Sequence, residues 1–187
     1  IFTGNMSYRP NVEAVSDFVR DILPRIWAQR PEAEFYIVGM DPSPAVRRLA
    51  DGNRIVVTGR VDDVRPFFDS ATVAVAPLRI ARGLQNKVLE AMAMRLPVVA
   101  SPAAFNGITA VAGRDLLVPE APDAFAGAVV ALLGDPARRD RYAASARGCV
   151  ERNHDWAMTL DRLERVVTGG DETGPESKQG EESTTRP

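Results

Sequence analysis

The 187-residue sequence has the composition of an ordinary globular domain and is nearly neutral. Hydrophobic residues make up 45% of the chain, charged residues 26%, and the formal net charge is −2. A chain this close to neutral gives no electrostatic case for binding nucleic acid or an anionic membrane surface. The single cysteine, Cys149, excludes an internal disulfide framework and suits a reducing compartment. Because no apolar run is long enough to span a bilayer and no signal peptide is recognisable, we expect a cytoplasmic domain.

The two ends of the chain differ in character. The chain opens on Ile1-Phe2-Thr3-Gly4, the pattern of a buried strand without an initiator methionine, so we expect this to be the inner edge of a larger protein. Residues 168–187 contain no hydrophobic residue and carry five acidic against two basic residues. Such a segment cannot bury enough surface to offset its ordering entropy. We therefore expect a folded domain over residues 1–167 and a disordered acidic tail over residues 168–187.

Short apolar runs alternate with segments of helical periodicity along the body of the chain. The apolar runs are hydrophobic throughout rather than alternating, which indicates a parallel sheet covered by helices on both faces. This order of elements predicts a doubly wound, Rossmann-like α/β domain. The predicted strands are 1–4, 34–38, 55–58, 73–76, 97–100 and 116–118. The predicted helices are 11–29, 43–50, 64–70, 84–94, 123–133, 136–153 and 155–167.

The loops after the predicted strands carry glycine and basic residues. In an open parallel sheet, ligands bind beyond the carboxyl ends of the strands, where these loops gather. Three of the first four strands end on glycine or are followed directly by it, which permits close backbone approach. The basic side chains in or near these loops are Arg9, Arg60, Arg79, Arg82 and Lys87. Together they predict a site for an anionic, phosphate-bearing ligand.

The predicted helix 84–94 combines an apolar stripe with a polar one. Its core stripe consists of Leu84, Val88, Ala91 and Met92. Gly83, Lys87 and Glu90 share the neighbouring stripe at a spacing of i, i+4 and i+7. The free N–H groups of a helix N-terminus bind anions, and Gly83 would leave them accessible while Lys87 adds a positive charge. Lys87 is the only lysine outside the predicted tail.

Glu90 is the only polar residue between Val88 and Met94, so a buried carboxylate there would need a partner. The two vicinal hydroxyls of a ribose could supply one, because a carboxylate offers two acceptor oxygens. An ion pair with Lys87, or hydrogen bonds from the amides of a neighbouring loop, would satisfy it as well. Spacing alone leaves these alternatives open. The absence of GxxxxGK[ST] and GxGxxG patterns disfavours P-loop and dinucleotide sites.

Two other polar features favour structural roles. The Asp62-Asp63 pair is predicted to be a helix N-cap ahead of Val64 rather than a metal site. The single histidine, His154, is expected to be structural, and no metal site is predicted.

Several segments resemble the group 1 (family 4) retaining glycosyltransferases. Residues 83–93 (GLQNKVLEAMA) with 96–101 (LPVVAS) resemble the donor-site signature of that family, and residues 113–119 (GRDLLVP) resemble a strand downstream of it. The segments 2–4 (FTG), 57–61 (VTGRV) and 132–136 (LLGDP), with Asp155-Trp156, also fit. The resemblance covers residues 1–167.

The resemblance implies the C-terminal, nucleotide-sugar-binding half of a GT-B type double-Rossmann glycosyltransferase. In that family the donor lies between the two halves, the acceptor is bound mainly by the N-terminal half, and transfer occurs with retention and without metal. It implies a UDP- or GDP-linked sugar as co-substrate, no cofactor, and a glycan or lipid-linked acceptor in polysaccharide synthesis, for example of exopolysaccharide. The full-length protein would be cytoplasmic, with peripheral association at the inner face of the membrane as an alternative.

The resemblance also implies roles for individual residues. Glu90 matches the glutamate that binds the nucleotide ribose, and Arg60 and Val61 match the loop that meets the base. The predicted catalytic residues are Lys87 and Arg9, which would stabilise the leaving diphosphate. The predicted donor-binding residues are Gly4, Asn5, Arg60, Val61, Arg79, Arg82, Gly83, Leu84, Gln85, Asn86, Lys87 and Glu90.

Two positions depart from the family pattern. The family motif E-x7-E would place its first glutamate, which contacts the donor sugar, at Arg82, and Asn5 stands where arginine is usual. These departures leave the donor sugar open. Two alternatives therefore stay open, a nucleotide-sugar-binding module without catalysis and half of a nucleotide-sugar epimerase.

Overall fold

Five short parallel strands alternate with helices, as the sequence predicted. The computed structural model describes residues 1–154, so the predicted helix 155–167 and tail 168–187 lie outside the described residues. The strands are β1 (Phe2–Thr3), β2 (Phe35–Val38), β3 (Ile55–Gly59), β4 (Ala74–Ala76) and β5 (Val98–Ala100). The helices are α1 (Arg9–Asp17), η1 (Phe18–Ile22), α2 (Leu23–Trp27), α3 (Pro44–Arg47), α4 (Arg65–Ser70), α5 (Asn86–Ala93), α6 (Pro102–Phe105), α7 (Pro122–Gly134) and α8 (Pro136–Asn153).

The strands lie in the order β3-β2-β1-β4-β5. β1, β2 and β3 form one parallel sheet, and β4 and β5 form a second parallel pair. Backbone hydrogen bonds connect the two at Ile1, whose amine donates to the Val73 carbonyl at 2.9 Å and whose carbonyl accepts from Val75 N–H at 2.9 Å. The chain therefore runs outward from β1 to β3 and returns to place β4 beside β1. This reversal is the topological switch point at which doubly wound folds bind ligands.

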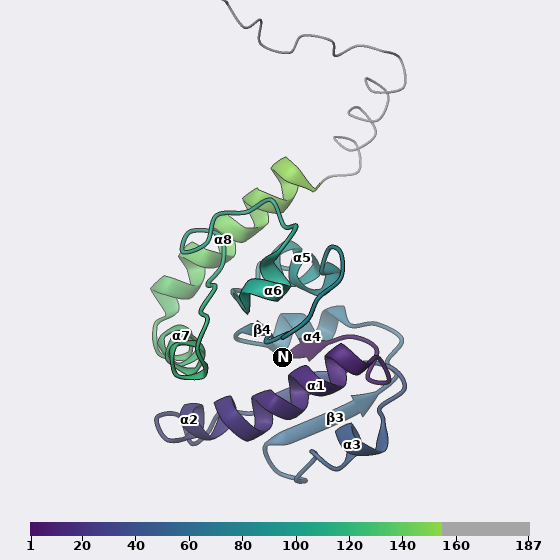
Figure 1. Cartoon of the computed structure of the whole chain (residues 1–187). Helices are drawn as coiled ribbons and strands as arrows, with labels where there is room; N and C mark the ends of the chain where they lie inside the picture. The colour runs from purple at the N-terminus through teal and green to yellow at the C-terminus, as the bar shows by residue number, and fades with distance from the viewer. Residues whose placement is uncertain (155–187) are drawn as a thin grey trace, which may run out of the picture. The chain divides into compact units, whose positions relative to one another are not determined.

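Helices cover both faces of the strands, because strands that are apolar on both sides must be buried on both sides. On one face, α7 packs against η1 and α2. The ring of Phe18 lies 4.5 Å from Phe35 of β2 and 6.1 Å from Phe125 of α7, between centroids. α5 packs against β4, β5 and α8. Figure 1 shows α1 and α2 in line on one side of the molecule and α5 and α8 on the other.

The helix predicted over residues 11–29 is interrupted. α1 passes into the π-helical turn η1 before α2 begins at Leu23. Pro24 explains the interruption, because proline has no N–H to donate and its ring would clash with the carbonyl four residues earlier in a regular α-helix. A wider turn just before Pro24 removes both conflicts.

The sixth predicted strand, 116–118, is wrong in extent. Leu117 donates to the Val98 carbonyl at 2.9 Å and accepts from Ala100 N–H at 2.9 Å, but the segment forms only isolated bridges. The pairing stops early because Pro119 follows and because Asp115, fully buried, turns the chain back. The Asp115 carboxylate accepts from Val111 N–H and from the Ser145 hydroxyl, at 2.8 and 2.6 Å.

The short helix α6 was not predicted from the sequence. Its signal is Ser101 followed by Pro102, an N-cap residue followed by the proline favoured in a first turn. The Ser101 hydroxyl accepts from Ala104 N–H at 3.2 Å. The helix predicted over 43–50 is shorter than expected, since α3 ends at Arg47, although Ser43 caps it in the same way.

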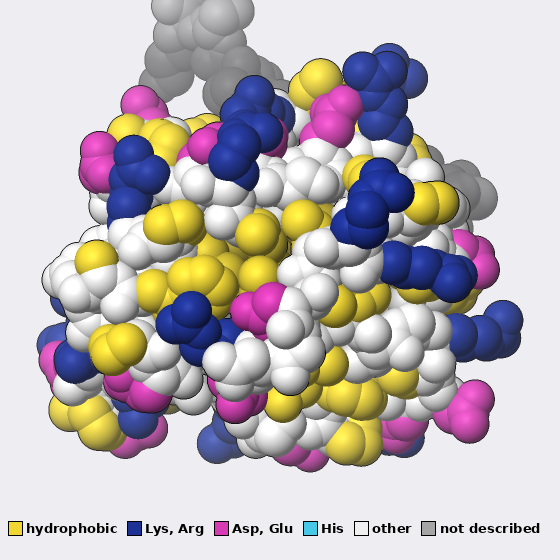
Figure 2. Space-filling view, turned by 90° about the horizontal axis from the view of Figure 1, so that it is seen from below, with side chains coloured by type: hydrophobic (Ala, Val, Ile, Leu, Met, Phe, Trp, Pro, Cys, Tyr) yellow, Lys and Arg dark blue, Asp and Glu magenta, His cyan; other side chains and the backbone are white. Residues whose placement is uncertain are grey.

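The face shown in Figure 2 carries basic and acidic side chains interspersed around a hollow with hydrophobic side chains. This mixture lacks the single-sign patch that binds nucleic acid electrostatically. Within residues 1–154, no helix is both long and apolar enough to cross a membrane.

The loops after β1 and β2 touch through two glycines. Gly4 and Gly39 have φ values of +151° and +149°, and a Cβ at Gly39 would overlap the carbonyl oxygen of Gly4. Because the overlap is with backbone, no side-chain movement can relieve it. The two loops can therefore meet only where Gly39 has no side chain.

We expect Gly39→Ala to lower the free energy of unfolding by roughly 3 kcal/mol or more, because it adds steric overlap to an unfavourable φ. Gly52→Ala is the matched control, since Gly52 also has positive φ (+72°) but open space around its Cβ position. The control should lose only about 1–2 kcal/mol. Urea denaturation measures both, and equal losses would refute the role of the Gly4–Gly39 contact.

Candidate functional site

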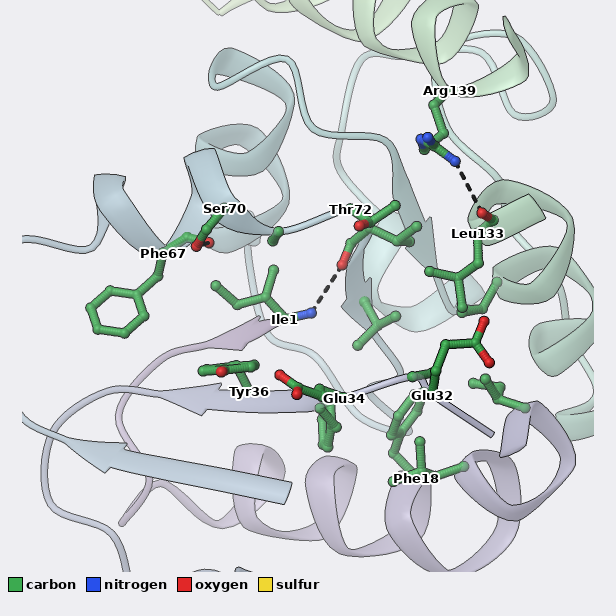
Figure 3. A pocket seen from close by; sticks show the side chains of 18 residues that line it. Ile1, Phe18, Glu32, Glu34, Tyr36, Phe67, Ser70, Thr72, Leu133 and Arg139 are labelled. Carbon is green, nitrogen blue, oxygen red and sulfur yellow. Dashed lines mark hydrogen bonds between the residues drawn. The ribbon is translucent and has the colours of Figure 1, made fainter. Parts of the chain in front are cut away.

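One cavity lies away from the loops that the sequence singled out. It has a volume of about 490 Å³ and opens near the amino ends of β1, β2 and β4, beside Ile1, Phe35 and Val73 (Figure 3). Its walls are mostly apolar, and two of its polar groups are the carboxylates Glu32 and Glu34. The basic side chain in its wall, Arg139, already donates to the Leu132 and Leu133 carbonyls. This amino-end cavity therefore has the wrong charge for a phosphate-bearing ligand.

A second pocket of about 370 Å³ lies at the carboxyl ends of β1, β2 and β3, next to the switch point. We call it the carboxyl-end pocket. The residues that line it are Thr3, Gly4, Val38, Gly39, Met40, Arg60, Val61, Val64, Asn86, Lys87 and Glu90. Six of the predicted donor-binding residues are brought together here, namely Gly4, Arg60, Val61, Asn86, Lys87 and Glu90.

The N-terminus of α5 faces this pocket. Asn86 and Lys87 are its first two residues, and the first helical hydrogen bond runs from Val88 N–H to the Gln85 carbonyl at 2.9 Å. The amides of Asn86 and Lys87 therefore precede the helical hydrogen bonds and have no partner within the helix. Free amides and the positive end of the helix dipole favour an anion at this position.

The ammonium of Lys87 lies half-buried in the wall of the pocket. It donates to Asn11 Oδ1 at 2.5 Å and sits 4.2 Å from the ring centroid of Phe2. Gly4 leaves room for it, because a Cβ at that position would lie 3.2 Å from Lys87 Nζ and 2.8 Å from Asn11 Nδ2. Burial lowers the pKa of the Lys87 ammonium to about 8, and the negative charge of Glu90 partly opposes that shift.

Glu90 is exposed at the edge of the pocket rather than buried. Among residues 1–154, its carboxylate has no hydrogen-bond or ion-pair partner, and Lys87 bonds to Asn11 instead. Because the Glu90 carboxylate is exposed to water, it does not need the partner that a buried carboxylate would need. Its exposure also leaves both carboxylate oxygens free to accept hydrogen bonds from a ligand in the pocket.

The structure changes the expected surroundings of Gly83. α5 begins at Asn86, so Gly83 lies in the preceding loop and not on the stripe of Lys87 and Glu90. Leu84, predicted to be in the core, is 45% exposed, whereas the other three members of its predicted stripe are buried. The loop residues Arg82, Gly83, Leu84 and Gln85 do not line the carboxyl-end pocket. The loop is held locally, through the Gln85 side-chain amide that donates to the Gly83 carbonyl at 3.0 Å.

Three other predicted residues also lie outside the pocket lining. The side chain of Arg9 is 88% exposed and pairs with Glu13 on the next turn of α1 at 2.6 Å. Arg79 pairs with Asp17 at 2.7 Å and borders a different pocket. The side chain of Asn5 is used locally, because its Oδ1 accepts from Ser7 N–H and from the Ser7 hydroxyl, both at 2.8 Å.

Sequence reasoning missed Asn11, which the structure places behind Lys87 with only 6% exposure. Its position in a predicted helix gave no sign of this, because the contact to Lys87 spans 76 residues. Met40 and Gly39 were placed in a loop but were not chosen as site residues, although both line the pocket.

The Asp62-Asp63 pair lies just ahead of α4 and does not supply its N-cap residue, which is Val64. Asp63 accepts from Arg65 N–H at 2.9 Å and pairs with the Arg65 guanidinium at 2.8 Å, which lowers the pKa of the Asp63 carboxyl. α4 begins at Arg65, one residue later than predicted. Within residues 1–154, no cluster of three His, Cys, Asp or Glu side chains is arranged to hold a metal ion.

Comparison with known proteins identifies relatives in sequence. Residues 1–135 match the family described as glycosyl transferases group 1. The phosphatidyl-myo-inositol mannosyltransferase of Mycobacterium leprae is 33% identical over 152 residues, which cover 78% of this chain and 40% of that protein. A GDP-mannose-dependent monoacylated alpha-(1-6)-phosphatidylinositol monomannoside mannosyltransferase of Corynebacterium glutamicum is 28% identical over 157 residues, covering 78% and 41%. The chain thus spans about two fifths of the length of these relatives.

Solved structures share the fold. Sucrose-phosphate synthase from Thermosynechococcus elongatus superposes with a TM-score of 0.67 at 24% identity, covering 91% of this chain and 45% of that one. Anabaena HepE in complex with UDP gives 0.70 at 14% identity, covering 90% and 48%. The C-terminal domain of a group 1 family glycosyl transferase from Francisella tularensis gives 0.62 at 16% identity, covering 83% and 84%.

The family match over residues 1–135, the identity to a curated mannosyltransferase and the strand order agree with one another. The chain belongs to the group 1 glycosyltransferases, and its doubly wound domain has the fold of the C-terminal half of a GT-B enzyme.

Proposed function

We propose that this domain binds a nucleoside-diphosphate sugar in the carboxyl-end pocket and, together with an acceptor-binding domain, transfers the sugar with retention to a glycan or lipid-linked acceptor. The observation that carries the proposal is that Lys87 and the start of α5, with its free amides, line the same pocket. Positive charge and free N–H groups in one pocket favour a diphosphate. We propose that these groups bind the diphosphate without a metal ion.

The nucleoside would lie toward β3. Arg60 and Val61 follow that strand and line the pocket, as does Met40. These side chains offer an apolar wall and a cation for a base. Glu90, exposed at the same pocket, would accept hydrogen bonds from both ribose hydroxyls. Both oxygens of this exposed carboxylate are available for that purpose, since neither has a partner among the described residues.

In the transfer step, an acceptor hydroxyl forms a bond to the anomeric carbon while the bond from that carbon to the diphosphate oxygen breaks. For retention, the acceptor hydroxyl approaches the face of the sugar from which the diphosphate departs. Its proton passes to the departing diphosphate oxygen, and negative charge develops on the nucleoside diphosphate as it leaves. Lys87 and the amides of Asn86 and Lys87 would stabilise that charge where it develops. Arg9 would need to leave Glu13 to contribute.

The donor base is a choice between uracil and guanine. The Corynebacterium relative is described as GDP-mannose-dependent, and the Anabaena structure was solved with UDP. The relatives with the higher sequence identity are mannosyltransferases, which favours GDP-mannose as the donor to test first.

We expect Glu90→Gln to weaken nucleotide binding about tenfold, because a charged hydrogen-bond acceptor is lost while size and helix are kept. Lys87→Ala should weaken UDP and GDP on the order of tenfold but leave uridine and guanosine unchanged, since its partner is the phosphate. Calorimetric titration of both variants with nucleosides and diphosphates measures these changes.

The ribose role of Glu90 has a separate control. Wild-type protein should bind 2′-deoxy-UDP or 2′-deoxy-GDP more weakly than the parent diphosphate, and Glu90→Gln should bind the two alike. Equal binding of both compounds by wild type would contradict the ribose role and leave the diphosphate site of Lys87 standing.

We expect the 187-residue chain alone to bind nucleoside diphosphate weakly and to transfer no sugar, because the proposed acceptor-binding domain is a separate one. A transfer assay with labelled GDP-mannose and UDP-glucose compares this chain with a longer parent protein that includes that domain. Efficient transfer by the chain alone would contradict the two-domain hypothesis. A parent that binds donor without transferring or hydrolysing it would favour the binding module without catalysis.

A further inference from the structure

Asn11 connects three segments of the pocket wall. It lies in the first turn of α1, and both the oxygen and the nitrogen of its side-chain amide form hydrogen bonds. Its Oδ1 accepts from Lys87 Nζ at 2.5 Å, and its Nδ2 donates to the backbone carbonyl of Asn5 at 2.8 Å. With 6% exposure, Asn11 is one of only three buried polar or charged residues among those described.

The chemistry of the two partners fixes the orientation of the amide. An ammonium can only donate and a backbone carbonyl can only accept, so the oxygen of Asn11 must face Lys87 and its nitrogen must face Asn5. Of the side chains of this size, aspartate would lack the donor and leucine would lack both groups. Of these three side chains, only asparagine can form both hydrogen bonds, to Lys87 and to the Asn5 carbonyl.

The same contacts control the direction of Lys87. The ring centroid of Phe2 lies 4.2 Å from the ammonium, and the position where Gly4 would carry a Cβ lies 3.2 Å from it. The ammonium has three N–H donors, and among the described residues Asn11 accepts from one. Lys87 lines the carboxyl-end pocket, where a ligand could accept from the others.

We propose that Asn11 is a positioning residue for the donor diphosphate, holding the Lys87 ammonium and the Asn5 loop in one fixed arrangement before the nucleotide binds. This inference rests on the proposed function, since it gives Asn11 no contact with the ligand itself. A preformed cation avoids the cost of ordering a long side chain at the moment of binding.

The charge state of Lys87 is the readout that a purely structural role would leave unchanged. In the ligand-free protein its pKa is lowered to about 8 by burial. Asn11→Asp should raise that pKa, because a carboxylate would face the ammonium. Asn11→Leu should lower it further, because the charged form loses its acceptor and remains buried.

Lysine-selective isotope labelling and NMR titration measure this directly, since the chain contains only two lysines, Lys87 and Lys178. Lys87→Arg removes one signal and thereby assigns it. Opposite shifts of the Lys87 pKa in the two Asn11 variants support the inference. A Lys87 pKa that stays the same in wild type and both variants overturns it.

The affinity for UDP or GDP provides a second test of the positioning role. Wild-type affinity for UDP or GDP should fall as the pH rises through about 8, because the free ammonium loses its proton there. Asn11→Leu should move this fall to lower pH. Asn11→Asp should weaken the diphosphate about tenfold at pH 7, because its carboxylate offsets the charge of Lys87, with nucleoside affinity unchanged.

The exposed Asn53 provides a matched control, since Asn53→Asp adds the same charge on a turn that does not line the pocket. It should leave diphosphate affinity unchanged. If neither UDP nor GDP binds wild type, the proposed function fails while the ligand-free titration still decides the role of Asn11. If wild type binds and the Asn11 variants keep its affinity and pH profile, the positioning role fails and the proposed function stands.

Discussion

The site depends on one half-buried cation, the Lys87 ammonium, and on the groups that compensate for its lost hydration. Removing an ammonium from water is costly unless hydrogen bonds or charges replace its hydration. Lys87 receives only partial compensation, from one amide oxygen, one aromatic ring and the negative charge of Glu90, and its pKa is therefore lowered. An anion in the adjoining pocket would complete the compensation. The half-buried lysine is therefore a preformed feature that a diphosphate would stabilise.

Close backbone packing makes this arrangement possible. Gly4 lies against Lys87 and Asn11, and Gly39 lies against Gly4. Any side chain at Gly39 would separate the loops after β1 and β2, and any side chain at Gly4 would press on the ammonium. Two glycines thus allow the loops after β1 and β2 to touch where both strands contribute to the pocket. The chemistry of the site and the packing of the fold share the same residues.

The two ends of the strands differ in charge. The amino-end cavity is larger but is bordered by Glu32 and Glu34 against the single cation Arg139, whereas the carboxyl-end pocket is bordered by Lys87, Arg60 and a helix N-terminus against the single carboxylate Glu90. Size alone would select the wrong cavity for an anionic ligand. Charge and the position of the switch point between β1 and β4 select the other.

The sequence by itself determined the fold class, because periodicity and apolar runs are local properties that survive without knowledge of contacts. Five of the six predicted strands form, and α8 has the predicted bounds. Local chemistry also explains two errors in the predicted helices. Pro24 interrupts a helix that was predicted to be regular, and Ser101-Pro102 starts the helix α6, which was not predicted. The family resemblance likewise followed from sequence, through residues 83–93.

The tertiary structure decided which of the predicted site residues meet. Lys87 and Glu90 were expected to pair or to share a ligand, and their separation became clear only when Asn11, from the other side of the switch point, took the ammonium. Arg79 has the same charge as Arg60, yet it pairs with Asp17 of α1, outside the pocket. Such outcomes depend on contacts between distant segments and on competition among partners. No spacing along the chain encodes them, because a side chain bonds to whatever the fold brings within reach.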